Sequence, residues 1–159
     1  MALSTAWKRA ARLFVVTALA VGTLGFASVP ASALVCPAGS TARSVTLRGI
    51  RETLGGADVY KYYLRMDYCY NATQYKITSR TAVSWGTTHW PGWTYQGQVA
   101  KWQLGCTGCS FYELQTQGYF RGEVSGVTFG DSYPTLKIRI YGNGAAYGWG
   151  TGFHDLRFI

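Results

Sequence analysis

The stretch that decides the fold is VYKYYLRMDYCY, residues 59–70. Every second side chain is apolar or aromatic, and this set consists of Tyr60, Tyr62, Leu64, Met66, Tyr68 and Tyr70. The positions between them include Lys61, Arg65 and Asp67. A period of two is typical of a β-strand that packs one face on a core and turns the other toward water. The segment is therefore predicted to be a long central strand.

A second alternating segment follows over residues 75–85, after a short turn at 71–73. Ile77, Val83 and Trp85 share one face of it, alternating with Lys76 and other polar residues. Two such segments separated by a short turn are expected to pair as an antiparallel hairpin. In this phase Trp85 is expected to pack inside, on the same face as Ile77.

Further strands are predicted on both sides of this hairpin, at 44–53, 93–104, 111–124, 136–140 and 145–149. Glycine-rich turns at 55–56 and 142–144 separate some of them. Aromatic residues and glycine are abundant, and no helical period appears after residue 33, which indicates short strands and tight turns. The spacing fits a sandwich or a small barrel; we predict an all-β fold, a single antiparallel β-sandwich of about seven strands.

Residues 1–33 read as a secretory signal peptide. Lys8, Arg9 and Arg12 precede an uncharged apolar run at 13–26, and Ala-Ser-Ala at 31–33 resembles a cleavage site. The apolar run is about 14 residues, whereas a transmembrane helix needs about 20. The sequence therefore predicts a secreted, extracellular protein with one domain at 34–159, and no stable membrane insertion after processing.

The charge of residues 34–159 is moderately basic, with 12 Lys and Arg against seven Asp and Glu. The basic residues lie singly along the chain, and no basic helix or single-strand-binding motif is present. Nucleic acid is therefore not expected as a partner. An anionic cell-wall polymer remains a partner that the charge would suit.

Four cysteines lie in the predicted domain: Cys36, Cys69, Cys106 and Cys109. An even number in an exported domain favours two disulfides, and three pairings are possible. We favour Cys36–Cys69 with Cys106–Cys109, because the first would fasten the N-terminal segment and the second would close a short turn. A redox-active CxxC or a zinc site is the weaker reading, since the flanks are strand-like and a second CxxC is lacking.

The sequence offers little support for catalysis, and no cofactor or metal is expected. It contains no nucleophile elbow, zinc-protease helix or phosphate-binding glycine loop. The carboxylate pairs that a glycosidase would need are Glu113 with Glu123, or Asp67 with Asp131. The simpler interpretation places these carboxylates on solvent-facing strand positions, so the protein is predicted not to be an enzyme.

The aromatic residues near Pro91 and Gly92 suggest binding instead. Trp90 and Trp93 are the ligand-binding candidates, because a Pro-Gly turn holds their rings with little entropy left to lose. Flat aromatic rings stack on the apolar faces of sugars, so we expect a non-catalytic module for cell-wall or environmental polysaccharide. The alternative is a secreted protein-binding factor, either an inhibitor or a small antibacterial effector, because Trp and Tyr also dominate protein interfaces. The same rings would equally serve to cap a core.

A resemblance to known proteins rests on six short segments: YCYN at 68–71, KITS at 76–79, GWTYQG at 92–97, QGYF at 117–120, YP at 133–134 and YGNG at 141–144. Together they resemble a functionally uncharacterised group of small secreted β-rich proteins of high-GC Gram-positive (actinobacterial) bacteria. The resemblance implies export and a β domain. It assigns no catalytic or binding residue and does not account for the CTGC segment at 106–109.

Overall fold

The structure, a computed structural model, describes residues 34–159; the predicted signal peptide at 1–33 lies outside the described residues. The described chain forms nine strands and contains no helix that could cross a membrane. The strands are β1 Thr41–Glu52, β2 Asp58–Asn71, β3 Lys76–Thr88, β4 Trp93–Gly105, β5 Phe111–Val124, β6 Val127–Ser132, β7 Thr135–Tyr141, β8 Ala146–Thr151 and β9 Asp155–Phe158.

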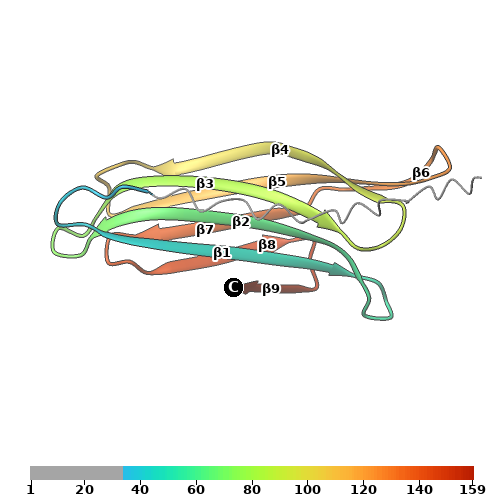
Figure 1. Ribbon diagram of the computed structural model, residues 1–159, viewed down its shortest axis with the longest axis horizontal. Coiled ribbons are helices and arrows are strands. Elements are labelled where there is room, and N and C mark those ends of the chain that lie inside the picture. Colours follow the sequence, from blue (N-terminus) through green and yellow to red (C-terminus); the bar gives the residue numbers. More distant parts are fainter. Residues whose placement is uncertain (1–33) are drawn as a thin grey trace, which may run out of the picture. The chain divides into compact units, whose positions relative to one another are not determined.

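The strands build two antiparallel sheets that pack together in two layers (Figure 1). One sheet has the order β3-β2-β1-β9, and the other has the order β4-β5-β7-β8. β7 pairs with the first half of β5, from Phe111 to Gln117, and β6 pairs along the same side of β5 from Phe120 to Val124. The predicted all-β sandwich is confirmed, with β6 and β9 in addition to the predicted strands.

The core lies between the sheets and contains the alternating side chains of β2. Tyr60, Tyr62, Leu64, Met66 and Tyr68 are at most 1% exposed. They pack against buried side chains of the second sheet, namely Leu114 and Phe120 of β5 and Leu136, Ile138 and Ile140 of β7. Period-two patterning in β2 therefore has the predicted consequence, since its apolar face is the centre of the fold.

The alternation in β3 changes phase at a β-bulge. Cys69 lies opposite Ser79 but Tyr70 lies opposite Ile77, so one extra residue, Thr78, occurs in β3. An extra residue moves the following side chains to the other face of the sheet. The expectation that Trp85 packs in the core is therefore wrong.

Trp85 lies instead on the outer face of the four-stranded sheet, opposite Tyr63. The two rings stack with centroids 4.9 Å apart and planes 4° apart. In place of Trp85, the residues of β3 that face the second sheet beyond the bulge are Arg80, Ala82, Ser84 and Gly86, opposite Tyr68, Met66, Leu64 and Tyr62.

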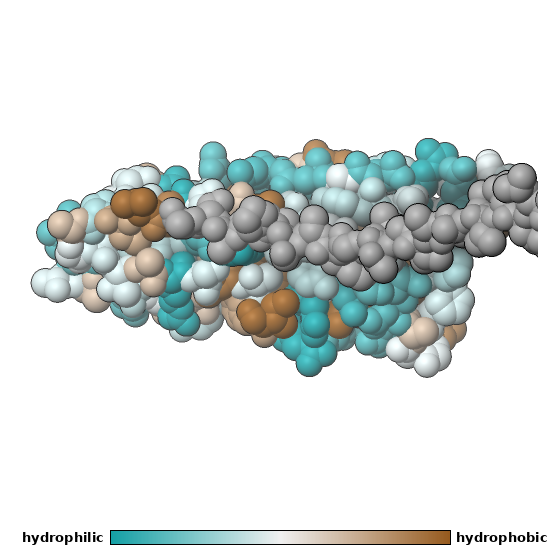
Figure 2. Space-filling view, viewed as in Figure 1, coloured by the Kyte–Doolittle hydropathy of each residue, from teal (hydrophilic) through white to brown (hydrophobic). Residues whose placement is uncertain are grey.

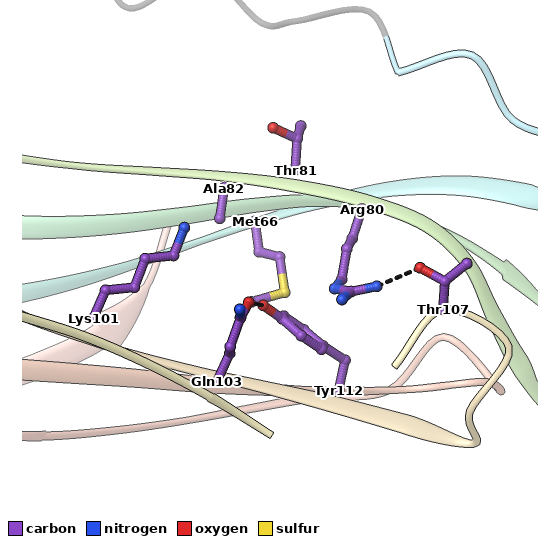
Figure 3. A pocket seen from close by; sticks show the side chains of 8 residues that line it. All are labelled: Met66, Arg80, Thr81, Ala82, Lys101, Gln103, Thr107 and Tyr112. Atoms are coloured by element: carbon purple, nitrogen blue, oxygen red, sulfur yellow. Dashed lines mark hydrogen bonds between the residues drawn. The ribbon is translucent and has the colours of Figure 1, made fainter. Parts of the chain in front are cut away.

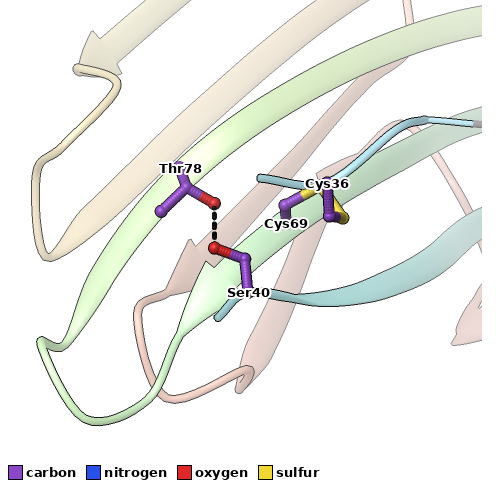
Figure 4. The surroundings of a disulfide bond; sticks show 4 residues. All are labelled: Cys36, Ser40, Cys69 and Thr78. Atoms are coloured by element: carbon purple, nitrogen blue, oxygen red, sulfur yellow. Dashed lines mark hydrogen bonds between the residues drawn. A yellow bond between two sulfur atoms is a disulfide. The ribbon is translucent and has the colours of Figure 1, made fainter. Parts of the chain in front are cut away.

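Two disulfides join the cysteines in the favoured pairing. Cys36–Cys69 fastens the segment before β1 to β2, and beside it Thr78 donates a hydrogen bond to Ser40 over 2.9 Å (Figure 4). Cys106–Cys109 closes the turn between β4 and β5. Two disulfides in a small β domain are consistent with an extracellular protein.

The surface is mainly hydrophilic on the face that Figure 2 shows, and its apolar patches there are small and separate. Several large apolar side chains of the described chain are nevertheless exposed, among them Leu54, Trp90, Trp102 and Trp149. Apolar surface of this kind, where it gathers, marks candidate sites of interaction.

Candidate functional site

Trp90 and Trp93 lie in the wall of one hollow at an end of the sandwich, with a volume of about 450 Å³. Besides the two tryptophans, residues of β1, β2, β6, the β1–β2 turn and the segment before β9 line it. They are Arg51, Glu52, Thr53, Leu54, Val59, Tyr60, Asp131, Ser132 and His154. The two predicted ligand-binding candidates are thus brought together, and they form a concave surface with polar neighbours.

The loop that carries Trp90 is held to the sheet by backbone hydrogen bonds. The N–H groups of His89 and Trp90 both donate to the carbonyl of Val59, over 3.0 and 3.1 Å. Gly92 adopts a φ of 85°, and its carbonyl accepts a hydrogen bond from Glu123 N–H over 2.6 Å. The Pro-Gly turn is therefore anchored on both sides, which lowers the entropy cost of holding the Trp90 ring in place.

Trp93 packs more deeply than Trp90. Its ring lies 5.8 Å from the ring of Tyr60 and 5.6 Å from that of Phe129, the latter at 84° in an edge-to-face contact. Trp93 is half-buried, whereas Trp90 is 47% exposed. Trp93 therefore caps the core and also lines the hollow, while Trp90 presents a ring to solvent.

Polar groups complete the hollow opposite the aromatic rings. The hydroxyl of Tyr60 shares a 2.6 Å hydrogen bond with Ser132. His154 accepts a hydrogen bond at Nδ1 from the N–H of Glu52 over 3.0 Å, which leaves Nε2 as the proton-bearing nitrogen of the neutral ring. Asp131 accepts a hydrogen bond from Tyr119 over 3.0 Å and keeps further acceptor capacity. The hollow therefore offers both donors and acceptors beside aromatic rings.

The hydroxyl of Tyr60 lies at the floor of the hollow and is hydrogen-bonded to Ser132. Burial raises the pKa of this hydroxyl above the ordinary value, although the hydrogen bond with Ser132 opposes this shift. A neutral tyrosine with a raised pKa at the floor of the hollow fits a hydrogen-bonding role. It does not provide the group with a pKa near the working pH that acid–base catalysis favours.

The sequence did not identify Tyr60, Ser132 and His154 as residues of this candidate site, and it offered Asp131 only as half of a glycosidase pair. The periodicity of its strand predicts Tyr60 as a core residue, and Tyr60 is both buried in the core and part of the lining of the hollow. The others come from short segments far along the chain that only the pairing of β6 with β5 and of β9 with β1 brings to this end. No local pattern places His154 there, whereas the Ser-Gly turn at 125–126 precedes the strand that carries Asp131 and Ser132.

The carboxylate pairs considered for a glycosidase do not form such a site. Glu113 and Glu123 lie on the same strand, ten residues apart, which corresponds to about 33 Å. Glycosidase pairs are about 5 to 10 Å apart. Asp67 bonds to Arg65 on the four-stranded sheet, whereas Asp131 lines the hollow and bonds to Tyr119 of the other sheet. Neither pair assembles around one hollow.

Comparison with known proteins assigns no function to the residues of this hollow. No family model matches the sequence, and no curated protein and no solved structure matches it either.

Proposed function

We propose that the protein is a secreted, non-catalytic binding module that holds a polysaccharide of the cell wall or the environment in the Trp90–Trp93 hollow. The observation that supports this most directly is the joint placement of Trp90, Trp93 and Tyr60 beside Ser132, Asp131 and His154. A sugar ring has apolar C–H faces and a rim of hydroxyls. Aromatic rings suit the faces, and a few polar groups placed around them suit the hydroxyls.

The hollow also has the size and rigidity that such a ligand needs. A volume of about 450 Å³ lies within the usual range of small-ligand sites, which is about 300–1,000 Å³. The anchored Gly92 turn means that binding orders few groups that were previously free.

Retention on insoluble glycans tests the proposal. The purified protein is incubated with cellulose, chitin, xylan and isolated bacterial cell walls, and the bound fraction is measured against protein concentration. We expect saturable retention on one matrix that soluble fragments of that matrix compete. If retention occurs on any anionic matrix and disappears with added salt, it is explained by the net positive charge of the protein and not by the hollow.

A matched pair of variants connects the retention to the hollow. Trp90→Ala removes a ring that is 47% exposed and lines the hollow, and Trp102→Ala removes one that is 50% exposed on β4, away from it. Stacking of one ring contributes about 0.5–1.5 kcal/mol, so Trp90→Ala should weaken retention about three- to tenfold while Trp102→Ala leaves it unchanged.

The alternative function, a secreted protein-binding factor, is favoured by a different surface. The outer face of the five-stranded sheet carries exposed Trp102, Leu104, Tyr147 and Trp149. The register places Trp102, Gln115, Lys137 and Trp149 in one row across four strands. Under this alternative, Trp102→Ala and Trp149→Ala would abolish binding to the protein partner, and Trp90→Ala would leave that binding unchanged.

A further inference from the structure

A second hollow, of about 390 Å³, opens between the edge strands β3 and β4, where the two sheets are not joined by strand pairing (Figure 3). Arg80 enters it from β3, and Lys101 and Gln103 enter it from β4. The ring of Tyr112 and the side chain of Met66 form its inner wall, while Thr81 points the other way.

Arg80 faces this space because of the bulge at Thr78. Beyond the bulge Arg80 lies opposite Tyr68, on the face of the sheet that meets the core. Its guanidinium lies 3.8 Å from the centre of the Tyr112 ring and donates from Nη1 to Thr107 Oγ1 over 2.6 Å. A cation–π contact and a hydrogen bond therefore hold the side chain in one position.

Lys101 lies opposite Thr116, which is 1% exposed, so it belongs to the inner face of the edge strand β4, although its own side chain is exposed to solvent. Neither Lys101 nor Arg80 has an acidic partner within 4.0 Å among residues 34–159, and no Asp or Glu lines the hollow. Two cations thus line one hollow, on either side of Met66, without a counter-charge from the described chain.

The neutral groups in the hollow are also arranged as donors. Tyr112 donates its hydroxyl proton to Gln103 Oε1 over 2.7 Å, so the Gln103 amide has its two N–H groups left to donate. Thr107 Oγ1 already accepts from Arg80, and its own O–H remains available as a donor. The Gln103 amide and the Thr107 hydroxyl can therefore still donate to an anion.

We propose that this hollow binds an oxyanion, either the carboxylate of an acidic sugar or a phosphate group, between Arg80 and Lys101. The guanidinium offers a planar fork that matches two oxygens of such a group, and the ammonium offers a point charge opposite it. Met66 lies six residues from Tyr60 along β2, which corresponds to about 20 Å. The oxyanion site is therefore separate from the Trp90–Trp93 hollow and does not depend on it.

In this proposal the CTGC turn at 106–109 holds Thr107 beside Arg80. Gly108 N–H donates to the Ile77 carbonyl over 2.6 Å, and Ile77 N–H donates to the Cys109 carbonyl over 2.9 Å. These bonds attach the small disulfide ring to the start of β3 and keep Thr107 beside Arg80. Opening the ring should release Thr107 and weaken the oxyanion site.

Inward-facing charges also protect open sheet edges from pairing with other chains, and this is the competing explanation for Arg80 and Lys101. The two explanations differ in what they predict. Edge protection requires no specific anion, and its loss would raise self-association. The oxyanion site requires saturable binding that depends on both cations.

The test is a titration of the ¹⁵N-labelled protein with inorganic phosphate, D-glucuronate and, as the neutral control, D-glucose, at constant ionic strength. We expect saturable shifts of the Arg80 Nε–H and Gln103 amide signals with phosphate, glucuronate or both, and none with glucose. Phosphate alone would identify a phosphate-bearing ligand, and glucuronate alone a carboxylated one. Shifts that stay linear with all three compounds would overturn the proposal.

Variants show whether the binding is local. Arg80→Gln and Lys101→Gln should each weaken binding about tenfold. Lys76→Gln removes the same charge from an exposed position on β3 that does not line the hollow, so it should change affinity little. Arg80→Lys keeps the charge without the fork and should recover part of the affinity. An equal loss in Lys76→Gln, or increased self-association with no change in binding, would contradict the oxyanion site.

Discussion

Gly86 on β3 leaves open the space that the ring of Phe120 on β5 occupies, and this contact joins the two sheets near the Trp90–Trp93 hollow. A Cβ on Gly86 would lie 2.6 Å from the Phe120 ring and 2.6 Å from the Tyr95 ring. Phe120 is fully buried and stacks on Tyr60 with centroids 4.0 Å apart. The floor of the hollow therefore depends on a glycine that belongs to neither of its walls.

Gly86→Ala should destabilise the fold, because the added Cβ would press on both rings and the Phe120 ring is fully buried. Overpacking of this kind costs about 1–3 kcal/mol. Gly130→Ala is the matched control, since a Cβ there meets its nearest atom at 3.9 Å and should leave stability nearly unchanged. Urea unfolding of both variants measures the difference. Equal stability of the two variants would show that the sheets are not packed as closely as described.

The two disulfides should contribute unequally to stability. Cys36–Cys69 spans 33 positions and Cys106–Cys109 only three. In the chain-entropy account the larger loop is worth about 3–4 kcal/mol and the smaller about 2 kcal/mol. The double variants Cys36→Ala/Cys69→Ala and Cys106→Ala/Cys109→Ala, compared by chemical denaturation, measure both. A larger loss from the CTGC pair would mean that its ring stabilises β3 and β4 beyond loop closure.

Alkaline pH should destabilise the protein through its buried tyrosines. Burial raises the pKa of Tyr68 to about 12, and its hydroxyl donates to the Gly144 carbonyl over 2.7 Å. An exposed tyrosine loses its proton near pH 10. The contribution of neutral Tyr68 is therefore complete below about pH 10 and is lost as the pH rises toward about 12.

The free energy of unfolding should fall above pH 10 by about 1.4 kcal/mol per pH unit for each such tyrosine. Burial also raises the pKa of Tyr95, so its effect has the same sign. Unfolding curves collected from about pH 9 to pH 11 measure the slope. Tyr68→Phe should reduce the slope of the unfolding free energy against pH by the contribution of one proton. An unchanged slope in this variant would show that Tyr68 titrates as an exposed group.

The fold was predictable from the sequence where one side of a strand is buried along its whole length. The alternation of β2 identifies Tyr60, Tyr62 and Tyr68 as core residues, and all three are buried. In β3 the same reasoning fails, because the bulge at Thr78 has no local signature and reverses the faces of Arg80 and Trp85. A single extra residue in the pairing thus changes which side chains reach the space between the sheets.

Two strands, β6 and β9, were not predicted from the sequence, for different reasons. β6 had a readable signal, since Ser125 and Gly126, with φ values of 50° and 80°, form the two-residue turn that returns the chain after β5. β9 had none, because Asp155–Phe158 is short and pairs with β1 about a hundred residues away. Trp90 and Trp93, the aromatic half of the candidate site, were therefore predictable. Of the polar half, Asp131 and Ser132 lie on β6, whose preceding turn could have been recognised, whereas His154 beside β9 had no such signal.

The most direct test of the central claim is to observe which tryptophans a sugar touches. The described domain contains five, Trp85, Trp90, Trp93, Trp102 and Trp149, and each gives one indole N–H signal in a ¹⁵N correlation spectrum. The protein is titrated with cello-, chito- and xylo-oligosaccharides. The polysaccharide module predicts that the signals of Trp90 and Trp93 shift saturably with one of these series while the other three stay fixed. Shifts confined to Trp102 and Trp149, or none with any series, would contradict it.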